Sequence, residues 1–143
     1  MTNTMHATTN YKALMELIPE LLDSSKRTDY KRFEAAGYMP LSFDFLYRDG
    51  KNRYVIAMAH NGTQNGDLMA DPDMEIALDP IAGVAEPLTY QNDYMGVYQQ
   101  VYIERDGVKM YSRQLRIDLD NFLWHWLQNI SEQGYKAVVS GED

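Results

Sequence analysis

The segment from His60 to Glu75 concentrates the residue types that could carry chemistry. It holds one histidine, three aspartates, one glutamate and two Asn-Gly pairs. Hard cations such as Ca²⁺ and Mg²⁺ take several carboxylate and carbonyl oxygens from turn-rich segments. An imidazole beside a carboxylate could act as a metal ligand or as a general base. The candidate metal ligands are His60, Asp67, Asp71, Asp73 and Glu75.

Two spacings bear on this metal hypothesis. Aligning Gly66 with the glycine of the calcium-loop template puts Pro72 where the closing glutamate belongs, so that template fails. Asp71, Asp73 and Glu75 share parity, so an extended strand would project all three to one side. The alternative is that the Asn and Asp residues cap turns while Glu75 faces water. We favour turn capping, because turn chemistry alone accounts for this composition.

Tyrosines recur every fourth residue at positions 90, 94, 98 and 102. Tyrosine combines a large apolar area with a polar tip, so these side chains could form a binding surface. The alternative, which we favour, is that alternate tyrosines fill the core of a small sheet. Together with the acidic segment, the candidate binding residues are His60, Asn65, Asp67, Asp71, Asp73, Glu75, Tyr90, Asp93 and Tyr94.

The net charge is confined to the middle of the chain. In total, 13 Lys and Arg oppose 21 Asp and Glu, giving a formal charge of -8 over 143 residues. Residues 54–104 contain eight acids and no Lys or Arg, so the remaining residues sum to zero. Direct nucleic-acid binding and docking on an anionic membrane both need a basic face, so we expect neither. An acidic surface instead favours a protein partner with a basic surface.

Catalytic and cofactor motifs are incomplete. The chain has no Cys, which excludes disulfides, thiolate-bound zinc and thiol catalysis. It contains no nucleophile-elbow pattern and no glycine-rich phosphate loop. We therefore predict no catalytic residue and no cofactor. The start of the sequence lacks the features of a signal peptide, and no apolar run reaches the length of a membrane span, so we expect a cytoplasmic protein.

The elements that would position these residues follow from hydrophobic periodicity. Residues 1–9 are expected to be a loose terminus. An apolar stripe over residues 10–24 predicts a helix that Pro19 kinks or breaks. A connector with a short helical piece ending at Gly37 should follow. A second stripe predicts a final helix, with Asp118 capping its start and Gly134 its end.

Between the helices the period changes to two. Leu41, Phe43, Phe45 and Tyr47 should share one apolar face, and a long loop should carry the acidic segment. The expected strands span residues 41–47, 53–59, 74–79, 84–90, 97–104 and 108–113, with a hairpin loop at residues 48–52. The sequence thus predicts one α+β domain over residues 1–143. It should contain an antiparallel meander sheet of about six strands, with the N-terminal and C-terminal helices packed on one face.

The run HNGTQNGDLMADPDMEI, followed by AEPLTYQNDYMGVYQQVY, resembles a family of small uncharacterised bacterial domains often found on plasmids and conjugative elements. The final helix, with FLWHWL at residues 122–127, is similar to the last element of that family. The resemblance covers roughly residues 41–135 and implies a domain shape and an association with mobile elements, but no activity. The matching positions are Gln64 to Met69, Asp71, Pro72, Met74, Glu75 and Thr89 to Asp93.

Three functions remain open at this stage. The first is a non-enzymatic interaction domain that uses its acidic central surface to bind a basic protein. The second is a metal-binding or metal-dependent hydrolytic site in residues 60–75. The third is an acidic DNA mimic that inhibits a nucleic-acid enzyme, which ranks last because eight acids over this length is a modest density.

Overall fold

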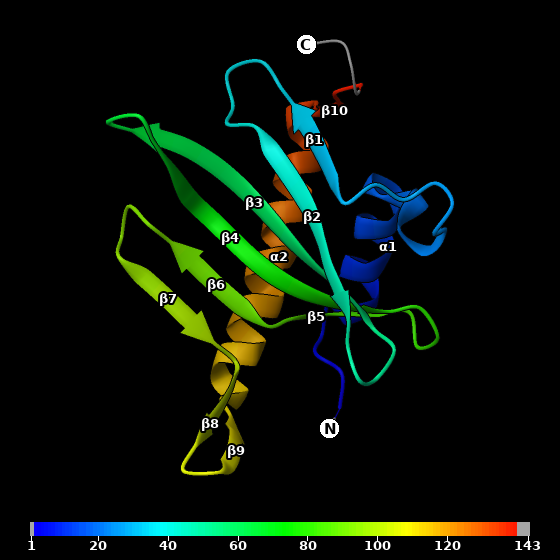
Figure 1. Cartoon of the computed structure of the whole chain (residues 1–143), viewed down its shortest axis with the longest axis vertical. Coiled ribbons are helices and arrows are strands. Elements are labelled where there is room, and N and C mark those ends of the chain that lie inside the picture. The colour runs from blue at the N-terminus through cyan, green and yellow to red at the C-terminus, as the bar shows by residue number, and fades with distance from the viewer. Residues whose placement is uncertain (1, 140–143) are drawn as a thin grey trace.

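Two α-helices and an eight-stranded antiparallel sheet make up most of the computed structural model, which describes residues 2–139 (Figure 1). The helices are α1 (Ala7–Leu17), the short 3-10 helix η1 (Pro19–Leu22) and α2 (Arg113–Gln133). The strands are β1 (Tyr30–Glu34), β2 (Leu41–Arg48), β3 (Tyr54–Gln64), β4 (Asp67–Asp79), β5 (Val84–Pro87), β6 (Thr89–Asn92), β7 (Val97–Gln100), β8 (Tyr102–Arg105), β9 (Val108–Tyr111) and β10 (Lys136–Ala137).

The main sheet runs in the order β10-β1-β2-β3-β4-β6-β7, with β5 pairing to one end of β4, while β8 and β9 form a separate hairpin. The predicted α+β class is confirmed, but the sheet has more strands than the six expected. The helix break at Pro19 is also confirmed, since α1 ends before it and η1 begins there. The helical piece expected before Gly37 is wrong, because Tyr30–Glu34 of that stretch form strand β1, which pairs with β2 and β10.

The long loop expected between residues 60 and 73 is instead a β-hairpin. Strands β3 and β4 run to Gln64 and from Asp67, joined only by Asn65 and Gly66. Both turn residues have positive φ, 53° and 84°, as in the two-residue turns whose twist matches paired strands. The loop prediction failed because an Asn-Gly pair occurs both in long loops and in the two-residue turns that close hairpins. Here Asn65-Gly66 is such a turn, and the residues on either side of it are paired strands.

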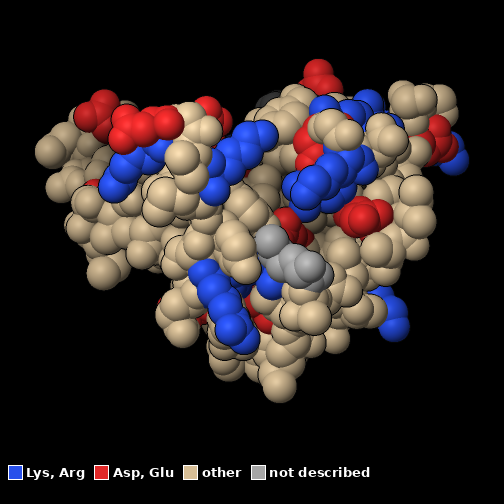
Figure 2. All heavy atoms as spheres, turned by 90° about the horizontal axis from the view of Figure 1, so that it is seen from below, with Lys and Arg blue, Asp and Glu red and all other residues tan. Residues whose placement is uncertain are grey.

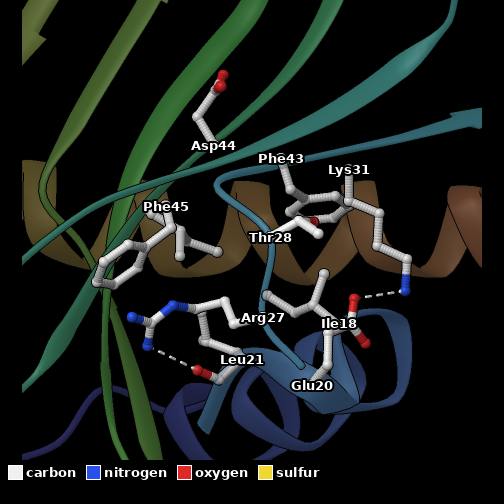
Figure 3. Close-up of a pocket in the computed structure, with 10 residues that line it drawn as sticks. Ile18, Glu20, Leu21, Arg27, Thr28, Lys31, Phe43, Asp44 and Phe45 are labelled. Atoms are coloured by element: carbon white, nitrogen blue, oxygen red, sulfur yellow. Dashed lines mark hydrogen bonds and ion pairs between the residues drawn. The ribbon is translucent and has the colours of Figure 1, made fainter. Parts of the chain in front are cut away.

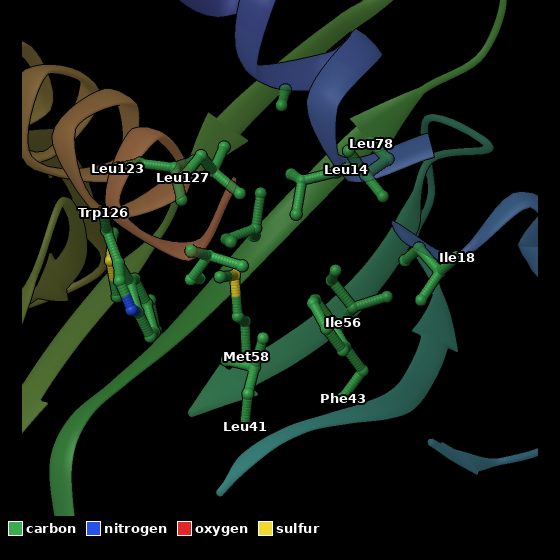
Figure 4. Close-up of a cluster of buried hydrophobic side chains, with 14 of the residues drawn as sticks. Leu14, Ile18, Leu41, Phe43, Ile56, Met58, Leu78, Leu123, Trp126 and Leu127 are labelled. Carbon is green, nitrogen blue, oxygen red and sulfur yellow. The ribbon is translucent and has the colours of Figure 1, made fainter. Parts of the chain in front are cut away.

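One face of the sheet and both helices enclose the core. In β3 and β4, alternate apolar residues such as Met58 and Ile76 are fully buried. They meet Leu14 of α1 and Leu123 of α2 in one cluster (Figure 4). The period-two pattern of the strands therefore defines a single buried face.

The other side of β2, β3, β4 and β6 is named here the open face. At the middle of these strands its cross-strand rows join small residues to acidic ones, because the alternate positions there are mostly Ala, Ser, Asp and Glu. One row is Asp44, Ala57 and Glu75, and the next is Ser42, Ala59, Asp73 and Gln91.

A β-bulge changes which face the end of β2 presents. The register shifts between Phe45 and Tyr47, so that Phe45 pairs with Ile56 of the core face and Tyr47 pairs with Val55 of the opposite parity. The prediction that Tyr47 shares a face with Phe43 and Phe45 is therefore wrong, because the extra residue moves Tyr47 to the open face.

The N-terminal segment is tied to α2 through a buried carboxylate. Asp120, which is 1% exposed, accepts hydrogen bonds from the Thr4 hydroxyl at 2.6 Å and from the His6 backbone N–H at 2.9 Å. Helix α1 begins at Ala7, so residues 7–9, expected to be loose, are helical. The backbone carbonyl of Asp120 also accepts a bond from Asn10 at 3.3 Å.

The boundaries of α2 differ from the prediction at one end. Ser112 caps the helix, because its hydroxyl accepts a hydrogen bond from the Leu115 N–H at 3.2 Å, and Asp118 lies inside the helix. The predicted C-cap is confirmed, since Gly134 has a φ of 78°. Within residues 2–139, no helix combines the length and the apolar character that crossing a bilayer requires.

Replacing Asp120 with Ala should lower the free energy of unfolding by about 2 kcal/mol, because two hydrogen bonds to a buried carboxylate are lost. Urea denaturation followed by circular dichroism measures this change. Asp118→Ala removes an exposed carboxylate two residues earlier on the same helix, so it should change stability by no more than about 0.5 kcal/mol. Equal losses in the two variants would contradict the tethering role.

Candidate functional site

The open face gathers carboxylates over a floor of small side chains. Ala57 and Ala59 of β3 lie between Asp44 of β2 on one side and Asp73 and Glu75 of β4 on the other. Figure 1 shows α2 crossing behind the sheet, and the buried core lies on that side. Among the described residues, neither helix covers the acidic rows.

Burial and like charges disfavour ionisation of the Asp73 carboxyl. Its pKa rises to about 6, first because burial removes water and then because Glu75, Asp44 and Asp93 are negative. Burial also raises the pKa of Asp44. The open face therefore holds carboxylates that repel one another.

Figure 3 shows that Asp44 points away from the core side of β2. Phe43 and Phe45 project to the opposite side, where a cavity of only about 20 Å³ lies beside η1. Arg27 packs over that cavity, with its guanidinium carbon 4.0 Å from the centre of the Phe45 ring. This small cavity is a packing gap, and Asp44 belongs to the open face.

Asp93 and Asp71 serve the structure of the neighbouring turn. Asp93 accepts hydrogen bonds from the Ala70 N–H at 2.7 Å and from the Gln91 side chain at 2.8 Å, and these bonds lower its pKa. Asp71 accepts a bond from the side chain of Asn92 at 2.9 Å. Both carboxylates therefore fasten the β6–β7 turn to β4.

His60 lies on the core side, between β3 and the end of α2. Its Nδ1 accepts a hydrogen bond from Trp126 Nε1 at 3.2 Å, and its Nε2 lies 3.1 Å from the Tyr135 hydroxyl. That hydroxyl donates to the Met39 carbonyl at 2.6 Å, so the neutral ring with its proton on Nε2 completes the network. Burial lowers the pKa of His60, and the Asp71 charge only partly opposes this. Both ring nitrogens are therefore engaged within the fold.

The other predicted residues are dispersed. Asn65 and Asp67 are exposed at the tip of the β3–β4 hairpin. The Tyr90 ring packs edge-on against Phe122 of α2, with 5.2 Å between the ring centres. The Tyr94 hydroxyl lies over Gly62, where a Cβ would collide with it. Tyr90 thus serves packing, whereas Tyr94 connects the β6–β7 turn to strand β3.

Of the five predicted metal ligands, only Asp73 and Glu75 share the open face, while His60 lies on the other side of the sheet. In the part of the chain that the structure describes, no three His, Asp or Glu side chains gather closely enough to hold a metal ion.

An ion-pair network that sequence reasoning missed borders the open face. Glu86 of β5 accepts hydrogen bonds from Arg53 at 2.7 Å, from Arg116 at 3.0 Å and from the Tyr102 hydroxyl at 2.6 Å. Burial opposes the charge of Glu86, but these three donors outweigh burial and lower its pKa. Asp49 binds the other side of the Arg53 guanidinium at 2.7 Å. Figure 2 shows basic and acidic side chains intermixed on the face seen from below.

Two cavities lie on the open side of the sheet. One, of about 510 Å³, is lined by Tyr30, Arg32, Met39, Pro40, Ser42, Asn61, Gly62, Thr63 and Leu68. The other, of about 390 Å³, is lined by Tyr47, Asp49, Lys51, Arg53, Glu75, Leu88, Thr89, Tyr98, Gln100 and Tyr102. Glu75 therefore belongs both to the acidic rows and to the wall of the second cavity.

Asp44 is the site residue that sequence reasoning should have found. It alternates with Phe43 and Phe45 in β2, just as Glu75 alternates with Met74 and Ile76 in β4. In each strand the acidic residue lies between two apolar ones, so its side chain points to the face opposite the core. The alternation therefore placed Asp44 on the polar face, although the partner strand was not known.

A family model described as Domain of unknown function (DUF6908) matches residues 9–136. The match agrees with the resemblance to an uncharacterised domain and extends it to α1, whereas the bacterial source and the association with mobile elements stay predictions. Neither the curated proteins nor the solved structures contain a significant match.

Replacing Asp73 with Asn should stabilise the protein near pH 7.5 by about 1 kcal/mol. The raised pKa means that ionisation of Asp73 costs stability as the pH climbs from about 4 to 6, and Asn removes that cost. Partial exposure screens the charge, so the gain is smaller than the pKa shift alone suggests.

Urea denaturation of the two proteins at about pH 4 and pH 7.5 tests this expectation. Near pH 4 the carboxyl is protonated in the folded chain and about half protonated in the unfolded chain, so most of the cost of ionisation is absent and the gain should be only a small fraction of that at pH 7.5. A gain that is the same at both pH values would mean that the substitution acts by packing and not by charge.

Proposed function

The chain belongs to the family defined by the DUF6908 domain of unknown function. We propose that it is a non-enzymatic binding module and that its open face binds a basic segment of a protein partner. The single observation that carries this proposal is the crowding of Asp44, Asp73 and Glu75 without a counterion. In residues 2–139, no Lys or Arg forms an ion pair with any of the three. A bound cation would relieve their repulsion.

The arrangement favours binding over acid–base catalysis. His60 lies on the opposite side of the sheet, and both of its ring nitrogens are hydrogen-bonded. It is therefore not placed to act as a general base beside the acidic rows. The carboxylates instead flank a floor formed by Ala57 and Ala59. A shallow surface with acidic borders complements an extended chain that carries positive side chains.

A fluorescent peptide of alternating Gly and Arg tests the proposal by fluorescence anisotropy. The variant Asp44→Asn/Asp73→Asn/Glu75→Gln should bind it at least about tenfold more weakly than the unsubstituted protein, because three attractive charges are removed from the contact surface.

The matched control is Glu104→Gln/Asp106→Asn/Glu132→Gln, which neutralises three exposed acids outside the open face. The net charge changes equally in both variants, so only the position of the charges differs. The control should bind within about twofold of the unsubstituted protein. Equal loss in the two variants would reduce the effect to overall charge and overturn the proposal.

Affinity should also fall as NaCl rises from about 50 mM to about 500 mM, because salt screens charges at an exposed surface. The triple open-face variant should show a shallower salt dependence than the unsubstituted protein. Affinity that does not depend on salt would contradict an electrostatic contact.

A further inference from the structure

The cavity of about 390 Å³ has tyrosine walls that come from distant strands. Tyr47 lies on β2, Tyr98 on β7 and Tyr102 on β8. In the sheet, β3, β4 and β6 separate β2 from β7. Tyr47 and Tyr98 can line one cavity only because the open face curls, so this end of the face is concave.

The charges that line this cavity are not equivalent. Arg53 is held between Asp49 and Glu86, at 2.7 Å from each, so its charge is compensated. Glu75 forms no ion pair within the described residues. The uncompensated carboxylate thus lies in a wall that also carries three aromatic rings.

We propose that this cavity is the anchor pocket for an arginine side chain of the basic segment. This inference rests on the proposed function of the open face and adds which side chain of the partner enters and where. A guanidinium stacks on aromatic rings and pairs with a carboxylate, and the tyrosines with Glu75 offer both. Binding surfaces commonly draw most of their affinity from one such desolvated Arg or aromatic anchor.

The chain itself uses this contact nearby. The Arg48 guanidinium carbon lies 4.0 Å from the centre of the Tyr54 ring, at the end of the same β2–β3 hairpin. The proposed contact would be the equivalent arrangement between two molecules.

Lys51 supplies an independent test of the sign of the ligand. It lines the same cavity, and no ion pair neutralises its ammonium in the described part of the chain. An entering guanidinium is repelled by this charge, whereas an anionic group would be attracted by it. Lys51→Ala should therefore tighten the binding of the Gly-Arg peptide about two- to threefold.

The aromatic walls are tested by paired substitutions and the same anisotropy measurement. Tyr47→Leu/Tyr98→Leu keeps apolar bulk but removes two ring faces, so it should weaken binding about five- to tenfold. Tyr47→Phe/Tyr98→Phe keeps both ring faces and should bind within about twofold of the unsubstituted protein. Both tyrosines are about half exposed, so we expect both variants to fold, which thermal melts check.

The outcomes separate the two proposals. If the open-face acid variant loses binding while the Leu variant retains it, the acidic face binds but the anchor pocket is refuted. If the unsubstituted protein does not bind the peptide, the proposed function is refuted, and the anchor pocket that rests on it is refuted as well. Weaker binding after Lys51→Ala, or preferential binding of a Gly-Glu peptide, would reverse the assigned charge of the ligand and overturn the inference.

Discussion

The alternation of side chains along β3 and β4 is the constraint on which the rest of the structure depends. Met58 and Met74 face the helices, while their neighbours Ala59 and Asp73 face the other way. Because successive side chains in a strand alternate, a slip of one residue would bury Asp73 in the apolar core. The same register that assembles the core therefore also assembles the acidic rows.

Periodicity predicted much of this framework. The alternation in β3, in β4 and in β2 as far as Phe45, the break at Pro19 and the helix end at Gly134 are all local signals, and the structure confirms them. The failures arose where one local signal has two meanings. Asn65-Gly66 was interpreted as part of a loop but closes a hairpin, and the bulge beside Phe45 leaves no trace in the alternating pattern.

The candidate site was predictable only in part, because it joins residues that are distant in the sequence. The net charge pointed to residues 54–104, yet Glu86 and Asp93 of that segment are engaged by nearby donors. Asp44, from outside the segment, completes the acidic rows through the β2–β3 register. Charge per segment therefore indicated a region, whereas strand pairing decided which carboxylates face one another and which are neutralised.

The bond from Trp126 to His60 links the docking of α2 on β3 to the protonation of one imidazole. The indole N–H of Trp126 donates to Nδ1 of His60 at 3.2 Å, and a doubly protonated ring has no lone pair there to accept it. The buried indole N–H would then lose its acceptor, because Trp126 is only 5% exposed. Acid therefore acts on this fold at the contact between the sheet and its supporting helix as well as at the carboxylates.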